Sequence, residues 1–358
     1  MTHKKAIYHP VLLLSLLLTS LLAACSSDIG NESAEAGEPV AFSLAFNNTV
    51  TRAGVDDNRT IDNLWPKDAH VTISNVTSTY TVAMGAKTSD FTVGESPSLS
   101  SDVATSLSPI ADDGNFIWPT TNPNWSFSAW YPAGDHPQMN ITVAADQTVW
   151  KETSNPNGLK DAEYNAYDLL YCPSTTVTFR QKPVTLNFLH QLARVVVIVN
   201  SNYTEDKGEV TAVEFGGGKV ALSGSIQNLG TTGANGATTW TTGTQNSTIK
   251  MRDHSTDDEK ASHVYTYECM LPPQASDGTV SNLVKIYSHG TQKGERTFKT
   301  SDMSFEMKAG YQYTYNLLIS EQGVITLATV MVTDWETGQA VGNTATIPNN
   351  SYPTNAVQ

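Results

Sequence analysis

Apolar and polar residues alternate along many short stretches of this chain, and clusters of Gly, Pro, Asn and Asp separate those stretches. Alternation with a period of two places every second side chain on one face of a β-strand, so each stretch predicts a strand with one buried face. The clearest example is 40–46, in which Phe42, Leu44 and Phe46 alternate with small or polar residues. The predicted strands are 40–46, 70–76, 79–84, 125–130, 177–179, 184–200, 210–215, 219–226, 264–270, 283–287, 311–318 and 324–333.

The strand count and the spacing of the turns predict an all-β protein built from sandwich domains, because no repeat period of a propeller appears. Beyond the amino terminus, only 161–171 predicts a short helix. The β-branched run 195–199 predicts a strand buried on both faces, and we place a domain boundary close to it. The expected division is an N-terminal sandwich at 40–187 and a C-terminal sandwich at 188–358, the latter with a long surface loop at 230–248.

The amino terminus predicts export and a lipid anchor. Two lysines precede an apolar run at 11–22, which is about half the length that crosses a bilayer. The run ends in Leu-Ala-Ala-Cys, the form of a bacterial lipobox, in which the cysteine accepts a diacylglycerol. We predict a signal peptide at 1–24, acylation of Cys25 (palmitate included) and an acidic tether at 25–39. An ordinary cleavage site beside a coincidental cysteine is the alternative.

Charge and cysteine content exclude several classes of protein. The chain has 21 Lys and Arg against 35 Asp and Glu, a formal net charge of -14, and such a surface repels the phosphate backbone of nucleic acids. Only three cysteines occur, too few for a disulfide scaffold or a Cys-rich zinc module. Cys172 and Cys269 could pair in an oxidising compartment, although they fall in different predicted domains.

The sequence predicts no enzyme, no cofactor site and no metal site. No G-x-S-x-G or H-E-x-x-H pattern occurs. The run Phe-Gly-Gly-Gly-Lys at 215–219 lacks the first Gly and the Ser or Thr of a phosphate-binding loop, so it predicts a glycine bulge entering a strand. Acidic and histidine residues at 253–263 could hold calcium, but they lack the EF-hand order, which favours a solvated acidic loop. His190 lies alone between leucines, as a structural histidine does.

Four aromatic residues are candidates for stacking on sugars, and they lie in or beside one predicted strand: Trp118, Trp125, Trp130 and Tyr131. Their alternating pattern favours packing into a core over an exposed binding platform.

Five stretches occur in an order and at a spacing that are more specific together than any one of them alone. They are the lipobox with its following strand and Thr51-Arg52-Ala53; Phe116-Ile-Trp-Pro119 with Trp125-Ser-Phe-Ser-Ala-Trp-Tyr-Pro132; Tyr167-Asp-Leu-Leu-Tyr171; Val184 to Ile198, which contains Phe-Leu-His-Gln-Leu-Ala-Arg-Val; and Phe305 to Tyr315 followed by Thr333-Asp-Trp-Glu-Thr-Gly338. With these stretches the chain resembles the fimbrillins, pilus subunits of the Bacteroidales.

The resemblance implies two tandem transthyretin-like β-sandwiches and a lipoprotein precursor at the cell outer membrane. It further implies that an arginine-specific protease cuts after an arginine that follows the first strand; Arg52 matches by position and Arg59 is the fallback. A plain polar turn residue is the alternative for Arg52. Loss of 26–52 would strip one strand and leave an apolar groove with unpaired backbone groups, which can accept a strand of another fimbrial subunit. Such a head-to-tail contact builds a filament that contributes to adhesion.

The carboxyl-terminal tail departs from this picture of a stalk subunit. A donor strand should alternate apolar residues over about eight positions, but after Trp335 only Val341, Ala345 and Ile347 are suitable. A tip, cap or anchor-like subunit therefore stays open, with surface glycans or proteins of a host or bacterium as adhesion targets. The alternative from another class is a monomeric glycan-binding surface lipoprotein, which an exposed row of aromatic residues would favour.

Overall fold

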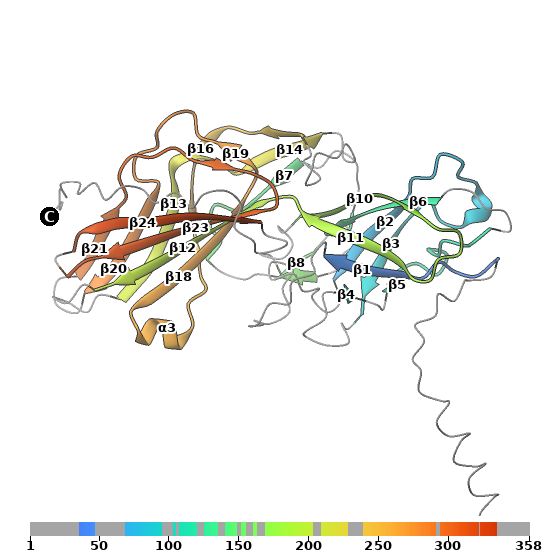
Figure 1. The fold of residues 1–358 in the computed structure, drawn as a ribbon, viewed down its shortest axis with the longest axis horizontal. Coiled ribbons are helices and arrows are strands. Elements are labelled where there is room, and N and C mark those ends of the chain that lie inside the picture. The colour runs from blue at the N-terminus through green and yellow to red at the C-terminus, as the bar shows by residue number, and fades with distance from the viewer. Residues whose placement is uncertain are drawn as a thin grey trace, which may run out of the picture.

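The structure is a computed structural model, and it describes residues 36–46, 69–94, 103–104, 107–119, 125–134, 140–148, 152–154, 160–162, 169–202, 209–227, 239–290, 294–321 and 323–334. Figure 1 shows that the described strands form two lobes. The prediction of an all-β fold is confirmed. Within the described residues, the elements other than strands are a 3-10 turn, η2 (Val82–Met84), and a short helix, α3 (Asp257–Ala261).

The first lobe is a single sheet that curls around its own core. Its strands are β1 (Phe42–Phe46), β2 (His70–Asn75), β3 (Thr88–Val93), β4 (Val103–Ala104), β5 (Leu107–Pro109), β6 (Trp125–Tyr131), β10 (Leu170–Val177) and β11 (Val184–His190). They are ordered β4-β1-β11-β10-β6-β2-β3-β5. Phe42 of β1 and Phe91 of β3 belong to opposite halves of this order, yet their ring centroids are 5.7 Å apart. The two halves of the sheet therefore face each other across the core.

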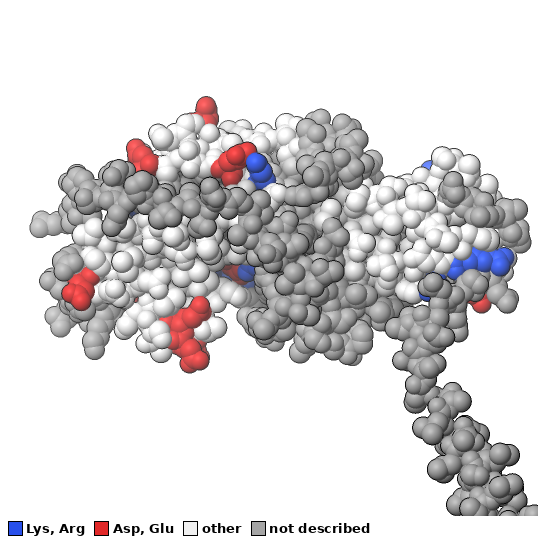
Figure 2. Space-filling view, in the orientation of Figure 1, with Lys and Arg blue, Asp and Glu red and all other residues white. Residues whose placement is uncertain are grey.

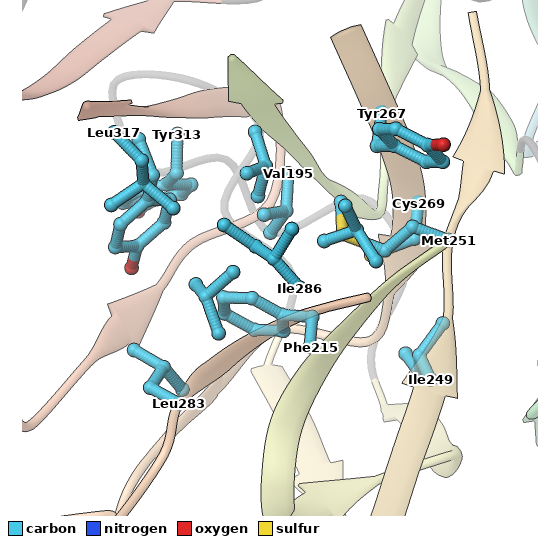
Figure 3. Close-up of a cluster of buried hydrophobic side chains, with 14 of the residues drawn as sticks. Val195, Phe215, Ile249, Met251, Tyr267, Cys269, Leu283, Ile286, Tyr313 and Leu317 are labelled. Carbon is cyan, nitrogen blue, oxygen red and sulfur yellow. The ribbon is translucent and has the colours of Figure 1, made fainter. Parts of the chain in front are cut away.

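The second lobe is a sandwich of two sheets. The five-stranded sheet has the order β17-β18-β12-β23-β24, and the four-stranded sheet has the order β16-β13-β20-β21. The strands are β12 (Ala193–Ser201), β13 (Glu209–Ala221), β16 (Gln245–Lys250), β17 (Arg252–Asp253), β18 (Val264–Leu271), β20 (Val284–Gly290), β21 (Gly294–Lys299), β23 (Tyr311–Ile319) and β24 (Ile325–Asp334). Figure 3 shows Val195 and Leu317 of one sheet facing Phe215 and Ile286 of the other, and all four are fully buried.

Seven shorter strands complete the described fold. β7 (Asn140–Thr142), β14 (Ser223–Gln227) and β15 (Thr239–Thr242) form a three-stranded sheet in the order β15-β14-β7. β8 (Glu152–Ser154) pairs with β9 (Lys160–Ala162), and β19 (Gln274–Ala275) pairs with β22 (Glu306–Met307).

The segment 140–148 attaches to the second lobe, although it lies between two strands of the first lobe in sequence. β7 pairs with β14, and the Val143 amide donates to the Leu222 carbonyl at 2.8 Å. The Gln147 side chain donates to the Met270 carbonyl at 2.8 Å and accepts from the Met270 amide at 2.9 Å. The lobes are therefore joined by this segment as well as by the direct passage from β11 to β12.

The prediction of one long strand at 184–200 is wrong, because two strands occupy this range. β11 ends at His190 and β12 begins at Ala193. Between them the Gln191 amide donates to the Leu169 carbonyl at 2.8 Å, and the Leu192 carbonyl accepts from the Gly310 amide at 3.0 Å. These bonds to distant segments turn the chain from one lobe into the other. Val195, Val196 and Val197 are buried on both faces of β12, as the β-branched run predicts.

Two further predicted elements are replaced by others. The predicted strand 79–84 is a turn containing η2, because β2 already pairs with β3 and β6 and offers no free edge. The predicted helix 161–171 contains the end of β9 and the start of β10, and the described part of it is extended because Leu170 pairs with both Tyr131 and His190.

Three strand limits also differ from the predictions. Of the strand predicted at 177–179, only Val177 is strand, as the last residue of β10. The strand predicted at 210–215 and the first part of that predicted at 219–226 are one strand, β13, and the rest of the latter is β14. Part of the loop predicted at 230–248 is strand, since β15 and β16 lie there; residues 228–238 are outside the described residues.

The glycine run at 215–219 is the bulge that the sequence predicts. The register between β13 and β16 shifts between Phe215 and Val220, and the three glycines have φ values of 107°, 51° and 77°. A Cβ at Gly217 would lie 2.4 Å from the Ser281 carbonyl oxygen, so this position requires glycine on two grounds.

We expect Gln147→Glu to lower the free energy of unfolding by about 1–3 kcal/mol, because a carboxylate would face the buried Met270 carbonyl in place of a donor. Urea unfolding measures the change. Gln245→Glu is the matched control, since it also removes an amide bond to a carbonyl, that of Ala275 at 2.7 Å, but at an exposed position. Equal effects of the two substitutions would contradict the attachment of 140–148 through Gln147.

Candidate functional site

The strand β1 is second from the edge of the first lobe's sheet, next to the edge strand β4, and its side chains pack into the core. It pairs in parallel with β11 over five residue pairs, from Phe42 opposite Val184 to Phe46 opposite Phe188. On its other side, β1 forms two pairs to β4 within the described residues. Leu44 is fully buried and Phe42 is 4% exposed. In Figure 1, β1 lies between β11 and the short β4. Among the described strands, β1 therefore contributes core side chains while β11 is its one extended neighbour.

Phe42 is the centre of an aromatic cluster. Its ring meets those of Phe91, Phe116 and Phe127 edge-on, with centroids 5.7, 5.6 and 5.0 Å away. This edge-to-face geometry is the favourable one for aromatic pairs and adds about 0.5–1.5 kcal/mol per pair to the burial itself. Removal of β1 would take away the ring that these three phenylalanines share as a neighbour.

The residues that precede β1 are held by backbone hydrogen bonds. The Gly37 amide donates to the Trp118 carbonyl at 2.8 Å, the Trp118 amide donates to the Glu38 carbonyl at 3.0 Å, and the Val40 amide donates to the Phe116 carbonyl at 2.7 Å. Removal of 36–46 would leave these groups of Phe116 and Trp118 without their present partners. It would also uncover the edge of β11, whose Val184, Leu186 and Phe188 are fully buried. The segment thus occupies a position that is both apolar and rich in backbone donors and acceptors.

The predicted lipidation site Cys25 and the predicted cleavage sites Arg52 and Arg59 lie outside the described residues. The carboxyl-terminal residues 335–358 lie outside them too. Their roles stay predictions.

The aromatic residues considered for sugar stacking are packed in the first lobe, as the alternation predicts. Trp118, Trp125 and Tyr131 are at most 1% exposed, and Trp130 is 5% exposed and donates from Nε1 to the Gly134 carbonyl. The large hydrophobic side chains exposed within the described residues are Val76, Val82, Ile110 and Met331, none of them aromatic. These four aromatic residues therefore offer no stacking surface for a glycan.

The acidic segment 253–263 is a capped helix and its flanks, and not entirely the loop that the sequence predicts. The Thr256 hydroxyl accepts from the Glu259 amide, and the Glu259 carboxylate accepts from the Thr256 amide at 2.7 Å. Asp253 pairs with Lys260 at 2.8 Å. Among the described residues, no group of three His, Cys, Asp or Glu side chains is placed to hold a metal ion. Figure 2 shows acidic side chains projecting at the lower edge of the second lobe, where Figure 1 places α3.

Cys172 and Cys269 are free thiols buried in separate cores, one in each lobe. Burial raises the pKa of Cys172 to about 12 and also raises the pKa of Cys269. The disulfide left open by the sequence does not form in this structure.

A buried ionic cluster in the second lobe has no counterpart among the sequence predictions. The Glu268 carboxylate is fully buried, and it accepts from the Arg194 guanidinium at 2.6 Å and from the Arg252 guanidinium at 3.2 Å. His254 Nδ1 lies 3.4 Å from it. Burial acts to raise the pKa of Glu268, but the charges of Arg194, His254 and Arg252 outweigh burial and hold that pKa below its ordinary value. The carboxylate is therefore ionised in the folded protein.

Comparison with known protein families gives a match to the fimbrillin-like model over residues 51–335. The chain belongs to the fimbrillin-like family. The matched region begins after β1, so that strand lies outside it.

Two solved structures share the fold of this fimbrillin-like chain. A proposed cell adhesion protein from Bacteroides ovatus is 15% identical with a TM-score of 0.55, and the match covers 83% of this chain and 98% of that one. A proposed cell adhesion protein from Bacteroides uniformis is 16% identical with a TM-score of 0.53, and the match covers 83% of this chain and 99% of that one. At such identities the likeness is one of fold alone. None of the curated proteins matches the chain.

The structure gives the His-Gln-Leu-Ala-Arg stretch of this fimbrillin-like chain a physical role. Phe188 is in the first core, His190 and Leu192 are buried where the chain passes between the lobes, and Arg194 neutralises Glu268 in the second lobe. The motif thus marks the connection between the two lobes.

Glu268→Gln is expected to lower the free energy of unfolding of the fimbrillin-like chain by about 3–5 kcal/mol, because it leaves two buried arginines without their counter-charge. Because the pKa of Glu268 is lowered in the folded state, the wild-type stabilisation is present above the ordinary value of 4.5 and is lost as the pH falls through the folded-state pKa. Urea unfolding at pH 7 and in acid measures both effects. Glu306→Gln, at an exposed pair with Lys308, is the control and should change little. A pH-independent difference between wild type and Glu268→Gln would contradict the assignment.

Proposed function

We propose that this chain is a non-enzymatic, lipid-anchored fimbrial subunit of the cell surface, built to exchange β1 for a strand of another subunit. Membership of the fimbrillin-like family and the position of β1 support this role. The observation that carries it is that β1 has two residue pairs to β4 on its outer side, while its Phe42 and Leu44 fill the core. A strand in this position can leave the sheet with few backbone hydrogen bonds to β4 broken. Another strand must then take its place to keep the first lobe's core buried.

Maturation would proceed by an arginine-specific protease that cuts after Arg52. Loss of the preceding residues removes β1 together with the backbone bonds of 37–40, and so opens an extended groove along β11. Pairing with a free strand edge is a general mode of peptide recognition, in which backbone bonds give affinity and alternate side chains give specificity. Because the contact is heterologous, repetition gives an open filament.

The lipid on Cys25 would hold the precursor at the outer membrane until cleavage. No helix within the described residues is long and apolar enough to cross a membrane. Two or more acyl chains give stable anchoring without a spanning helix. Cleavage after Arg52 would then separate the subunit from its anchor, whereas an uncleaved chain would stay at the membrane as an anchor-like or accessory subunit.

The position within a fimbria depends on the tail. The sparse apolar residues after Trp335 make a weak donor strand, which supports a tip or cap subunit that accepts or terminates more readily than it donates. Adhesion to surface glycans or proteins of a host or bacterium would then fall to the exposed end of such a subunit.

The test is to express residues 26–358 without the lipid and treat the folded protein with an arginine-specific protease. We expect one early cut after Arg52, seen by intact mass, and loss of the cut in Arg52→Lys but not in Arg59→Lys. Native size then distinguishes the roles: ladders indicate a stalk subunit, and a cleaved monomer that accepts a synthetic β1 peptide indicates a tip or cap subunit. A folded protein that resists cleavage at both arginines would overturn the maturation scheme.

A further inference from the structure

The strand β24 is an edge strand of the five-stranded sheet in the second lobe, and its core-facing side chains are only partly covered. Figure 1 shows it in dark red beside β23, its paired neighbour within the described residues. Tyr313 and Leu317 of β23 belong to the core and are 6% and 0% exposed. Val332 and Leu327, directly opposite them in β24, pack against the same core but are only partly buried. The core is therefore less well covered at β24 than at β23.

The edge that β24 presents is long and apolar. The strand spans ten residues, and Met331 is 39% exposed. Proteins often protect such an edge with Lys or Pro, but β24 contains neither. An edge strand of this kind is a template for pairing with a further strand. A strand added here would also cover the core-facing residues Ile325, Leu327, Val330 and Val332.

The chain supplies a suitable sequence directly after β24. Residues 335–358 lie outside the described residues, and their sequence has the pattern of a returning strand. Trp335-Glu-Thr-Gly338 has the length of a four-residue hairpin loop, with glycine at the last position of a type I turn. Pro348, which cannot donate to a ladder, follows nine residues later in the run 339–347 and its end. Between them, apolar residues recur at odd positions: Val341, Ala345 and Ile347.

A loop of this length fixes the register of the returning strand. It places Gln339 opposite Asp334, and so Val341 opposite Val332. Ala328 is an extra residue in β24, because the register with β23 shifts beside it. When this residue is passed over, the core-facing positions of β24 coincide with the odd positions of the tail: Val332 with Val341, Val330 with Asn343, Leu327 with Ala345, and Ile325 with Ile347.

We propose that residues 339–347 pair antiparallel with the outer edge of β24 in this register and close the sandwich of the second lobe. The proposal goes beyond the function proposed above and does not depend on cleavage after Arg52. Three modest apolar residues make a poor donor strand for another subunit, but they match the partly covered residues of β24. A tail held on its own lobe is not available to a neighbouring subunit, which agrees with a tip or cap position.

Engineered cysteine pairs test the register in residues 26–358. Met331→Cys/Gly342→Cys places two thiols opposite each other, whereas Met331→Cys/Thr346→Cys, the matched control, offsets them by four positions. Under mild oxidation of dilute protein, the first pair should close within one chain at least about tenfold faster than the control, because a disulfide needs Cα atoms within about 7 Å. Intact mass and counts of free thiols measure closure. The native Cys172 and Cys269 are buried and do not compete.

Two outcomes of this experiment would contradict the proposal. Equal rates for the two cysteine pairs would overturn the register. Disulfides that join two chains, in place of closure within one chain, would overturn the assignment to the tail and make the edge of β24 a contact between copies.

Substitutions along the tail test which of its faces is buried. Val341→Asn and Ile347→Asn should each lower the melting temperature by about 2–4 °C, because the odd positions lie over the core. Thr344→Asn and Thr346→Asn, on the other face, should each shift it by less than about 1 °C. Equal shifts at all four positions, or none, would overturn the proposal. Neither test uses Arg52, so failure here leaves strand exchange standing, and a chain that resists cleavage leaves the tail pairing standing.

Discussion

The first lobe depends on the insertion of β1 between β11 and the core. Phe42 and Leu44 close a core whose walls are the two facing halves of one sheet, and the parallel pairing to β11 fixes them there. The packing of this lobe's core therefore depends on one five-residue strand, β1. On its other side, within the described residues, the same strand pairs with two residues of β4. The proposed exchange would therefore remove the strand that closes this core.

The second lobe is organised differently, as a sandwich of two sheets, and the polar cluster around Glu268 is neutralised within one of them. Breaking that cluster would leave buried charge, so the five-stranded sheet is bound to one arrangement of β12, β17 and β18. The two lobes are thus stabilised in different ways, the first by an apolar strand next to its sheet edge and the second by a buried ionic cluster within one sheet.

The sequence predicted well those elements that local pattern decides. β1, β2, β6, β18, β23 and β24 follow clean alternation, and the glycine bulge follows from three consecutive glycines. The break at Gln191 and Leu192 was not predictable from the run of apolar residues around it, because Leu169 and Gly310, far away in sequence, supply the bonds that turn the chain. Likewise, 79–84 has the composition of a strand, but β2 has no edge left to pair with it. Trp118 and Trp125 are aromatic core residues in any one-dimensional view, and the sequence gives no sign that their indole N–H groups are buried without a hydrogen-bond partner among the described residues.

The double connection between the lobes has a mechanical consequence. Two bodies joined through a single peptide segment can swivel about it, and a pull on one reaches the other through one backbone. Here the β7–β14 pairing and the two bonds from Gln147 to Met270 form a second point of attachment, distant in sequence from the β11–β12 passage. Tension and torque are then shared between a covalent link and a hydrogen-bonded one. Unfolding of the second lobe would therefore also release a stretch of chain that lies between β6 and β10 of the first lobe in sequence.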